Sequence, residues 1–144
     1  MTVTRIKPTL IVLESSGLWA ARLRHRGLPP RLILAEVRSI EECTEQLIDC
    51  PRALVGIAVT GENLAAMLDL QLRLALDHPE ASVIVLADRG LERYELLFRE
   101  GGAAHVVFSP RELGSVIELL ARYTMRTAAG PLTPERIWAE LPWA

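Results

Sequence analysis

Lysine and aspartate are scarce in this sequence. Lys7 is the only lysine among 16 basic residues, and the aspartates are limited to Asp49, Asp69, Asp77 and Asp88. A chemistry that requires lysine or aspartate at a fixed position can therefore be checked by inspection. Long hydrophobic runs are also missing: none approaches the roughly 18 apolar residues of a membrane-spanning helix. The first residues have no small-residue cleavage site, which argues against a signal peptide.

The chain has only two cysteines, Cys43 and Cys50, seven positions apart. This spacing matches neither a C-x-x-C redox motif nor a zinc knuckle. Two turns of helix would separate the Cα atoms by roughly 10 Å, which is too far for a disulfide. We therefore expect two small core or flank residues and a reducing, cytoplasmic location.

Neither sign of charge dominates the chain. The 16 basic and 18 acidic residues give a net charge of −2, whereas nucleic-acid-binding domains are usually strongly basic. We therefore expect no nucleic-acid partner and no membrane partner. Half of the 144 residues are hydrophobic, so the chain can build the packed core of one domain.

Short apolar runs alternate with helical patterns along the chain. The runs predict strands at residues 9–13, 31–37, 53–59, 81–86 and 104–108. The patterns between and after them predict helices at residues 17–26, 39–49, 62–77, 91–100 and 109–126. Such alternation predicts an α/β fold with a parallel sheet and helices on both faces. We expect a flavodoxin-like, doubly wound, five-stranded sheet in the order 2-1-3-4-5.

Two helix starts carry the pattern of a capping box. Ser39 is followed three residues later by Glu42, and Ser109 by Glu112 with Pro110 at the first helical position. In such a box the hydroxyl and the carboxylate accept hydrogen bonds from free N–H groups at the helix start.

Ligands of an open parallel sheet bind beyond the carboxyl ends of its strands. Several polar residues follow the predicted strands: Glu14, Ser15, Thr60, Asn63, Asp88, Arg89 and Ser109. This rim could bind a small polar ligand, or its side chains could cap loops and face solvent.

Two stretches stand out at the end of the predicted sheet: residues 83–90, and the segment from Gly102-Ala103 to Ser109-Pro110. The second is similar to the GA-x-x-x-x-x-KP signature of the receiver domain of bacterial response regulators, and the first resembles the fourth strand of that family. The resemblance implies a two-component signalling context and five positions that carry phosphorylation. In that family, two acidic residues hold Mg²⁺ and an aspartate accepts the phosphoryl group. A hydroxyl residue and a lysine contact the oxygens of that group.

This sequence departs from most of those positions. The resemblance, which covers roughly residues 8–126, places Glu14 and Ser15 at the acidic pair and Ile57 or Ala58 at the acceptor. It places Ala87 at the hydroxyl position and Ser109 at the lysine position. Aspartyl phosphorylation needs a carboxylate nucleophile, a metal and a cation. We therefore expect a degenerate receiver pocket with no catalytic, cofactor or metal site, in a non-catalytic, phosphorylation-independent interaction module.

The alternative is a flavodoxin-like domain that binds a small molecule through the rim. Its candidate contacts are Thr60, Asn63, Asp88 and Arg89. A third reading, an enzyme of another type, has no visible nucleophile–base pair to support it.

Residues 127–144 differ from the domain at 1–126 and are expected to form a linker and a tail with a short helix. Trp138, Leu141 and Trp143 in this tail could anchor a partner protein or a second copy, or could pack on their own domain. Further candidate interaction residues are Trp19 near the degenerate pocket and Tyr94 and Leu97 in the fourth predicted helix.

Overall fold

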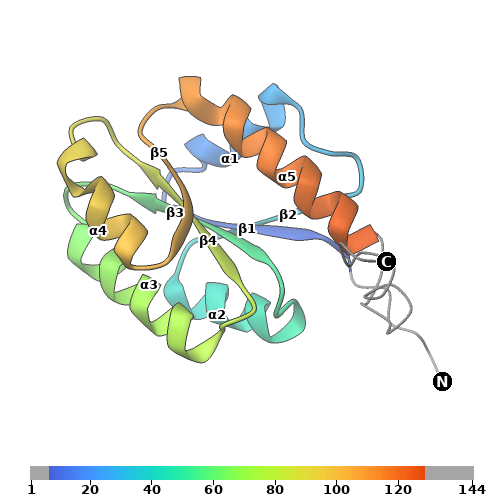
Figure 1. The fold of residues 1–144 in the computed structure, drawn as a ribbon, viewed down its shortest axis with the longest axis horizontal. Coiled ribbons are helices and arrows are strands. Elements are labelled where there is room, and N and C mark those ends of the chain that lie inside the picture. The colour runs from blue at the N-terminus through green and yellow to red at the C-terminus, as the bar shows by residue number, and fades with distance from the viewer. Residues whose placement is uncertain (1–6, 129–144) are drawn as a thin grey trace, which may run out of the picture.

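A computed structural model describes residues 7–128 of the chain. Five strands form one sheet: β1 (Thr9–Leu13), β2 (Ile33–Val37), β3 (Leu54–Val59), β4 (Ser82–Ala87) and β5 (Ala103–Val107). Neighbouring strands are all parallel, and their order is β2-β1-β3-β4-β5. The predicted fold class and strand order are therefore confirmed (Figure 1).

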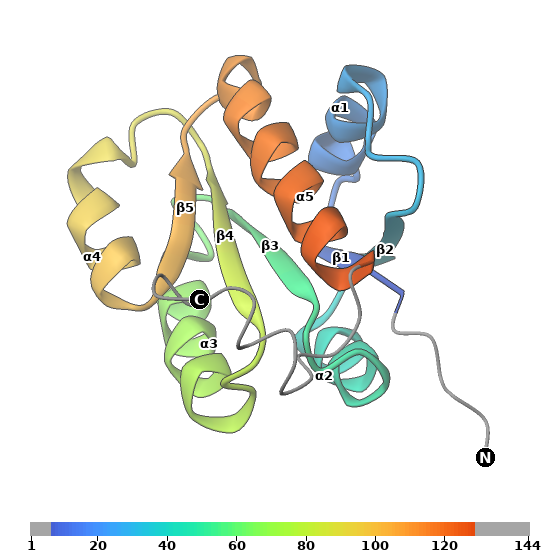
Figure 2. The same cartoon turned by 45° about the vertical axis from the view of Figure 1, so that its right-hand side comes forward.

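Helices cover both faces of the sheet. They are α1 (Leu18–Arg26), α2 (Ile40–Asp49), α3 (Leu64–Asp77), α4 (Glu95–Glu100) and α5 (Leu113–Ala128). Helices α1 and α5 lie side by side on one face, and α2, α3 and α4 cover the other (Figure 2). None of the helices within residues 7–128 has the length and apolar character needed to cross a bilayer.

The two faces build two separate cores, because successive side chains of a strand point to opposite faces. In β1, Ile11 and Leu13 join the core under α2, α3 and α4. Leu10 and Val12 join the core under α1 and α5. Burial on both faces explains why the central strands are continuous apolar runs rather than alternating ones.

Element boundaries shift where local turns compete with the pattern. Strand β2 begins at Ile33 rather than at residue 31, because the Leu32 N–H closes a turn on the Pro29 carbonyl at 3.1 Å. The last two helices open with 3-10 turns, η1 (Glu92–Tyr94) before α4 and η2 (Pro110–Glu112) before α5.

Both predicted capping serines are in place. Ser39 Oγ accepts from the Glu42 N–H at 3.1 Å, and Ser109 Oγ accepts from the Arg111 N–H at 3.2 Å. The paired glutamates reach one residue further back than in a standard box. Glu42 accepts from the N–H of Arg38, and Glu112 accepts from the N–H of Phe108.

Both cysteines are free, as the spacing predicts. Cys43 is buried in α2, and burial raises the pKa of its thiol to about 11. Cys50 follows the end of the helix and is partly buried. A buried thiol with a raised pKa is a poor nucleophile, so Cys43 is a packing residue.

Candidate functional site

The carboxyl ends of the strands bring the rim residues to one edge of the sheet, and Glu14 is the most deeply placed of them. It follows β1 and is 5% exposed. Its Oε1 accepts from the Trp19 N–H at 2.9 Å, and its Oε2 accepts from the Ala20 N–H at 2.8 Å. The Ser16 hydroxyl lies 3.4 Å from Oε1. Glu14 therefore caps the first turn of α1 with both carboxylate oxygens.

This cap follows from the local sequence. Gly17 stands at the N-cap of α1 with φ +79°, a conformation that favours glycine, and it has no side chain to accept from the helix. The free N–H groups of the first turn are instead satisfied by the carboxylate three residues earlier, where the positive end of the helix stabilises it. Its two oxygens are therefore committed to α1. Within residues 7–128, no group of three or more His, Cys, Asp or Glu side chains could hold a metal ion.

The end of β3 offers no group that could accept a phosphoryl. Ile57 packs in the core under α2, α3 and α4, and Ala58 packs in the core under α1 and α5. The register places Val59, rather than either of these, beside Ala87 of β4. Each side chain is apolar and at most 9% exposed.

Thr60 and Asn63 hold their own loop together. The Thr60 N–H donates to Asn63 Oδ1 at 2.7 Å, and the Asn63 N–H donates to Thr60 Oγ1 at 3.3 Å. The Asn63 Nδ2 donates to the Ala58 carbonyl at 3.1 Å. These contacts match the interpretation that rim side chains cap loops, and neither residue is part of the lining of the 340 Å³ cavity at this edge.

A cavity of about 340 Å³ opens at this edge between α1, the loop after β4 and the start of η2. Ser15 is exposed and lies outside its lining. Of the predicted rim and pocket residues, Ala87, Asp88, Arg89 and Ser109 line it. Trp19, predicted near the degenerate pocket, also lines it. The remaining lining residues were not predicted: Leu18, Arg22, Phe108, Pro110 and Arg111. A usable signal was present for Arg22, because position i+3 places it on the same face of α1 as Trp19.

The predicted interaction residues divide into three groups. Trp19 is 6% exposed, and its ring packs in the core under α1 and α5. Trp19 is therefore a core residue and not an exposed docking anchor. Leu97 is 47% exposed on α4. Tyr94 is partly buried, with the Arg93 guanidinium 4.9 Å from the centre of its ring. The tail residues Trp138, Leu141 and Trp143 lie outside the described residues.

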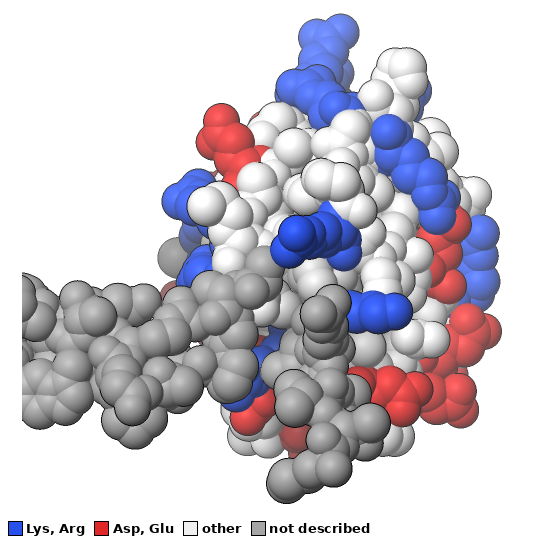
Figure 3. Space-filling view, turned by 90° about the vertical axis from the view of Figure 1, so that its right-hand side faces the viewer, with Lys and Arg blue, Asp and Glu red and all other residues white. Residues whose placement is uncertain are grey.

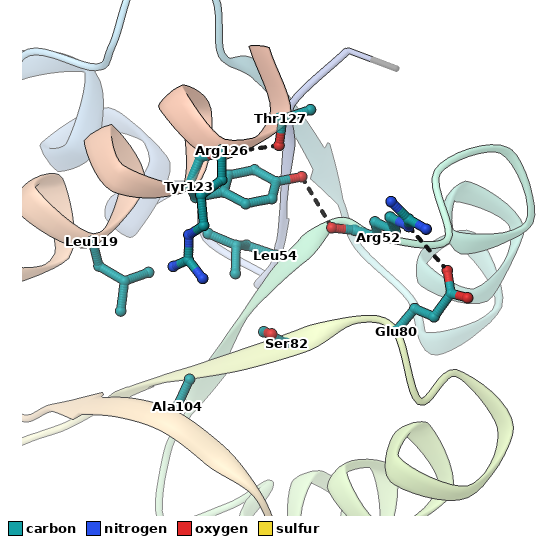
Figure 4. A pocket seen from close by; sticks show the side chains of 9 residues that line it. All are labelled: Arg52, Leu54, Glu80, Ser82, Ala104, Leu119, Tyr123, Arg126 and Thr127. Atoms are coloured by element: carbon teal, nitrogen blue, oxygen red, sulfur yellow. Dashed lines mark hydrogen bonds and ion pairs between the residues drawn. The ribbon is translucent and has the colours of Figure 1, made fainter. Parts of the chain in front are cut away.

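A second cavity, of about 520 Å³, lies at the opposite edge of the sheet, beside the last turns of α5 (Figure 4). The Tyr123 hydroxyl accepts from the Thr9 N–H at 3.3 Å and donates to the Arg52 carbonyl at 3.0 Å. Arg52 pairs with Glu80 at 3.3 Å. These polar groups tie α5 to the sheet. From this side, basic side chains are spread among uncharged ones (Figure 3).

Replacing Tyr123 with phenylalanine is expected to lower the free energy of unfolding by about 1 kcal/mol, because the hydroxyl and its two backbone partners lose hydrogen bonds. Burial raises the pKa of Tyr123, so the folded protein holds the phenolic proton more tightly than the unfolded chain. The natural chain should therefore lose stability as pH rises above about 10. Urea unfolding at pH 7 and above pH 10 checks both effects. The phenylalanine variant should lose less stability between the two pH values, and an equal loss would contradict the assignment.

No protein-family model matches the sequence, and no curated protein matches it. Solved structures do match. A response regulator from Thermotoga maritima is 18% identical with a TM-score of 0.69, and the match covers 83% of this chain and 98% of that chain. The signal receiver domain of an HD domain-containing protein from Pseudomonas fluorescens Pf-5 is 20% identical with a TM-score of 0.63, covering 91% and 98%.

A CheY-like protein, tadZ, from Pseudomonas aeruginosa PAO1 is 18% identical with a TM-score of 0.60, and the match covers 88% of this chain and 96% of that chain. Each of the three matches spans nearly the whole of the other chain and most of this one. The receiver resemblance is thereby confirmed in three dimensions: this chain has the fold of response-regulator receiver domains.

Proposed function

We propose that this chain is a receiver-like regulatory module that acts by contact with another protein or a second copy of itself, without catalysis and without phosphorylation. The proposal rests on the side chains that occupy the receiver positions at the carboxyl edge of the sheet. Among the described residues of this edge, the buried acid is Glu14, and both of its carboxylate oxygens accept hydrogen bonds from the first turn of α1. The acceptor and hydroxyl positions hold buried apolar side chains.

Phosphoryl transfer to a receiver depends on an acceptor carboxylate and on acids that are free to hold a metal, and the corresponding positions here hold apolar side chains and the capping Glu14. A carboxylate must attack, and a divalent cation and a positive side chain must stabilise the oxygens of the transferred group. Ser109 stands at the lysine position, and its hydroxyl accepts from the Arg111 N–H. The Ser109 hydroxyl caps η2, and because it is uncharged it cannot neutralise a phosphoryl group as a lysine would.

Exposed apolar side chains on α3 and α4 support an interaction role. Leu72 and Leu76 of α3 are 57% and 80% exposed, and Leu96 of α4 is 68% exposed. The two helices are neighbours, because the buried Gln71 amide of α3 donates to the Phe98 carbonyl of α4 at 3.0 Å. Large exposed apolar side chains on adjacent helices favour contact with another protein. We also propose a cytoplasmic location, since both cysteines are free thiols.

Acetyl phosphate with Mg²⁺ tests the proposal directly. The full chain is incubated with both, and its intact mass and sedimentation coefficient are compared with those of an untreated sample. We expect neither to change, because the acceptor position at the end of β3 holds buried apolar side chains.

A receiver domain with a complete acceptor site, treated in parallel, shows that the reagent is active. Gain of one phosphoryl group by the present chain would overturn the proposal. So would a change in sedimentation that requires both acetyl phosphate and Mg²⁺.

A further inference from the structure

Three arginines from separate elements line the 340 Å³ cavity at the carboxyl edge of the sheet. Arg22 comes from α1, Arg89 from the loop after β4, and Arg111 from η2. Asp88 is the one acidic residue of the lining among the described residues. The formal charge of the lining is therefore positive, in a chain whose net charge is −2.

None of these three guanidinium groups forms an ion pair with a carboxylate within the part of the chain that the structure describes. Other arginines do find such partners: Arg24 pairs with Glu36 at 2.9 Å, and Arg73 pairs with Asp69 at 3.1 Å. The positive charge around the cavity is thus available to a ligand. It belongs to the side chains and not to the end of α1, because Glu14 already accepts from the N–H groups there.

The rest of the lining is apolar. Trp19 and Phe108 are buried core residues that present part of their surface to the cavity, and Ala87 is fully buried behind it. Leu18 and Pro110 complete this wall. A volume of about 340 Å³ lies at the lower end of the range of small-molecule sites, roughly 300–1,000 Å³. The cavity therefore joins a basic rim to an apolar wall at a size that suits a small ligand.

We propose that this cavity binds a small organic phosphate without covalent change. Guanidinium groups match phosphate oxygens through paired N–H donors, which makes arginine the side chain best suited to the anionic group. The apolar wall receives the organic part of the ligand. The site is independent of the phosphorylation chemistry discussed above, because no bond to the protein forms.

The test uses the ¹⁵N-labelled full chain and follows its amide resonances by NMR at constant ionic strength. The probes are adenosine 5′-monophosphate, inorganic phosphate and adenosine. We expect saturable shifts at the amides of Asp88, Arg89 and Arg111. The monophosphate should bind about tenfold more tightly than inorganic phosphate, the effect of covering roughly 50 Å² of apolar surface. Adenosine, which lacks the anion, should bind at least about tenfold more weakly than the monophosphate.

Variants locate the binding. Arg89→Gln with Arg111→Gln should weaken binding of the monophosphate by about tenfold or more. Arg73→Gln on α3, which removes an exposed arginine away from the cavity, should leave it within about twofold. If the double variant loses its dispersed spectrum, Arg22→Gln replaces it, with an expected loss of several-fold. Unchanged affinity in the cavity variants would overturn the site. So would shifts spread over all arginine-bearing surfaces, or shifts reproduced by sodium chloride. The acetyl phosphate result is unaffected by either outcome.

Discussion

Replacing Glu14 with alanine is expected to lower the free energy of unfolding by about 3 kcal/mol. The substitution removes the acceptor for the N–H groups of Trp19 and Ala20 at the start of α1. Each buried donor that loses its partner costs about 1–3 kcal/mol, and loss of a helix cap alone costs roughly 0.5–2 kcal/mol. Since Glu14 is 5% exposed, water has little access to replace the carboxylate.

Urea unfolding followed by circular dichroism measures this loss. Glu14→Gln keeps one acceptor oxygen and should cost about half as much as the alanine variant. Glu118→Ala, an exposed glutamate on α5, is the control and should stay within about 0.5 kcal/mol. Mg²⁺ should not change the unfolding midpoint of the natural chain. A small loss in the Glu14 variants, or stabilisation by Mg²⁺, would show that this carboxylate is free to bind a metal.

The sheet was predictable because its central strands are buried on both faces. Short, continuous apolar runs that lie between helical patterns, such as residues 9–13 and 53–59, predict buried strands. The structure has β1 and β3 there. The strand order was inferred from the flavodoxin-like, doubly wound fold that five successive strand–helix units favour, since periodicity alone does not order strands. Strand ends were less predictable, because the turn after Pro29 is set by a backbone hydrogen bond that no hydrophobic pattern records.

The role of Glu14 could not be read from the sequence. A glutamate after the first strand is compatible with a metal ligand and with a helix cap. Which of them applies depends on how the chain turns at Gly17, and that turn brings the Trp19 and Ala20 N–H groups to the carboxylate. Residue type alone carries no information on that turn.

The arginine-lined cavity escaped prediction for a different reason. Its basic residues come from three elements that are far apart along the chain, and they meet only because parallel strands place their carboxyl ends at one edge. Arg89 was predicted at the rim from its strand. Arg22 and Arg111 lie within helical segments, where an exposed arginine is usually read as part of a solvated face. Trp19 was placed correctly near the degenerate pocket, but its burial was missed because it packs in a core that α5 also builds.

The end of β3, where receiver domains carry the acceptor aspartate, should be destabilised by a carboxylate in this chain. Ala58→Asp is expected to lower the free energy of unfolding by at least about 3 kcal/mol at pH 8, because it places an unpaired carboxylate in an apolar core. Ala58 is 9% exposed and packs with Leu86 and Leu113 in the core under α1 and α5. With Ala87 and Ser109 at the neighbouring strand ends, the hydroxyl and lysine positions supply no positive side chain.

The pH dependence of this variant distinguishes charge from shape. Burial should raise the pKa of the new carboxyl above the unfolded value of about 3.9. The folded variant then holds its proton more tightly, so the penalty from charge is absent below about pH 4 and grows as pH rises toward the folded pKa. Ala58→Asn has a similar shape without charge and should show no such trend. Urea unfolding of both variants at pH 4 and pH 8 makes the comparison. If Ala58→Asp and Ala58→Asn were equally stable at pH 8, this end of β3 would tolerate a carboxylate. The electrostatic argument against phosphorylation would then fail.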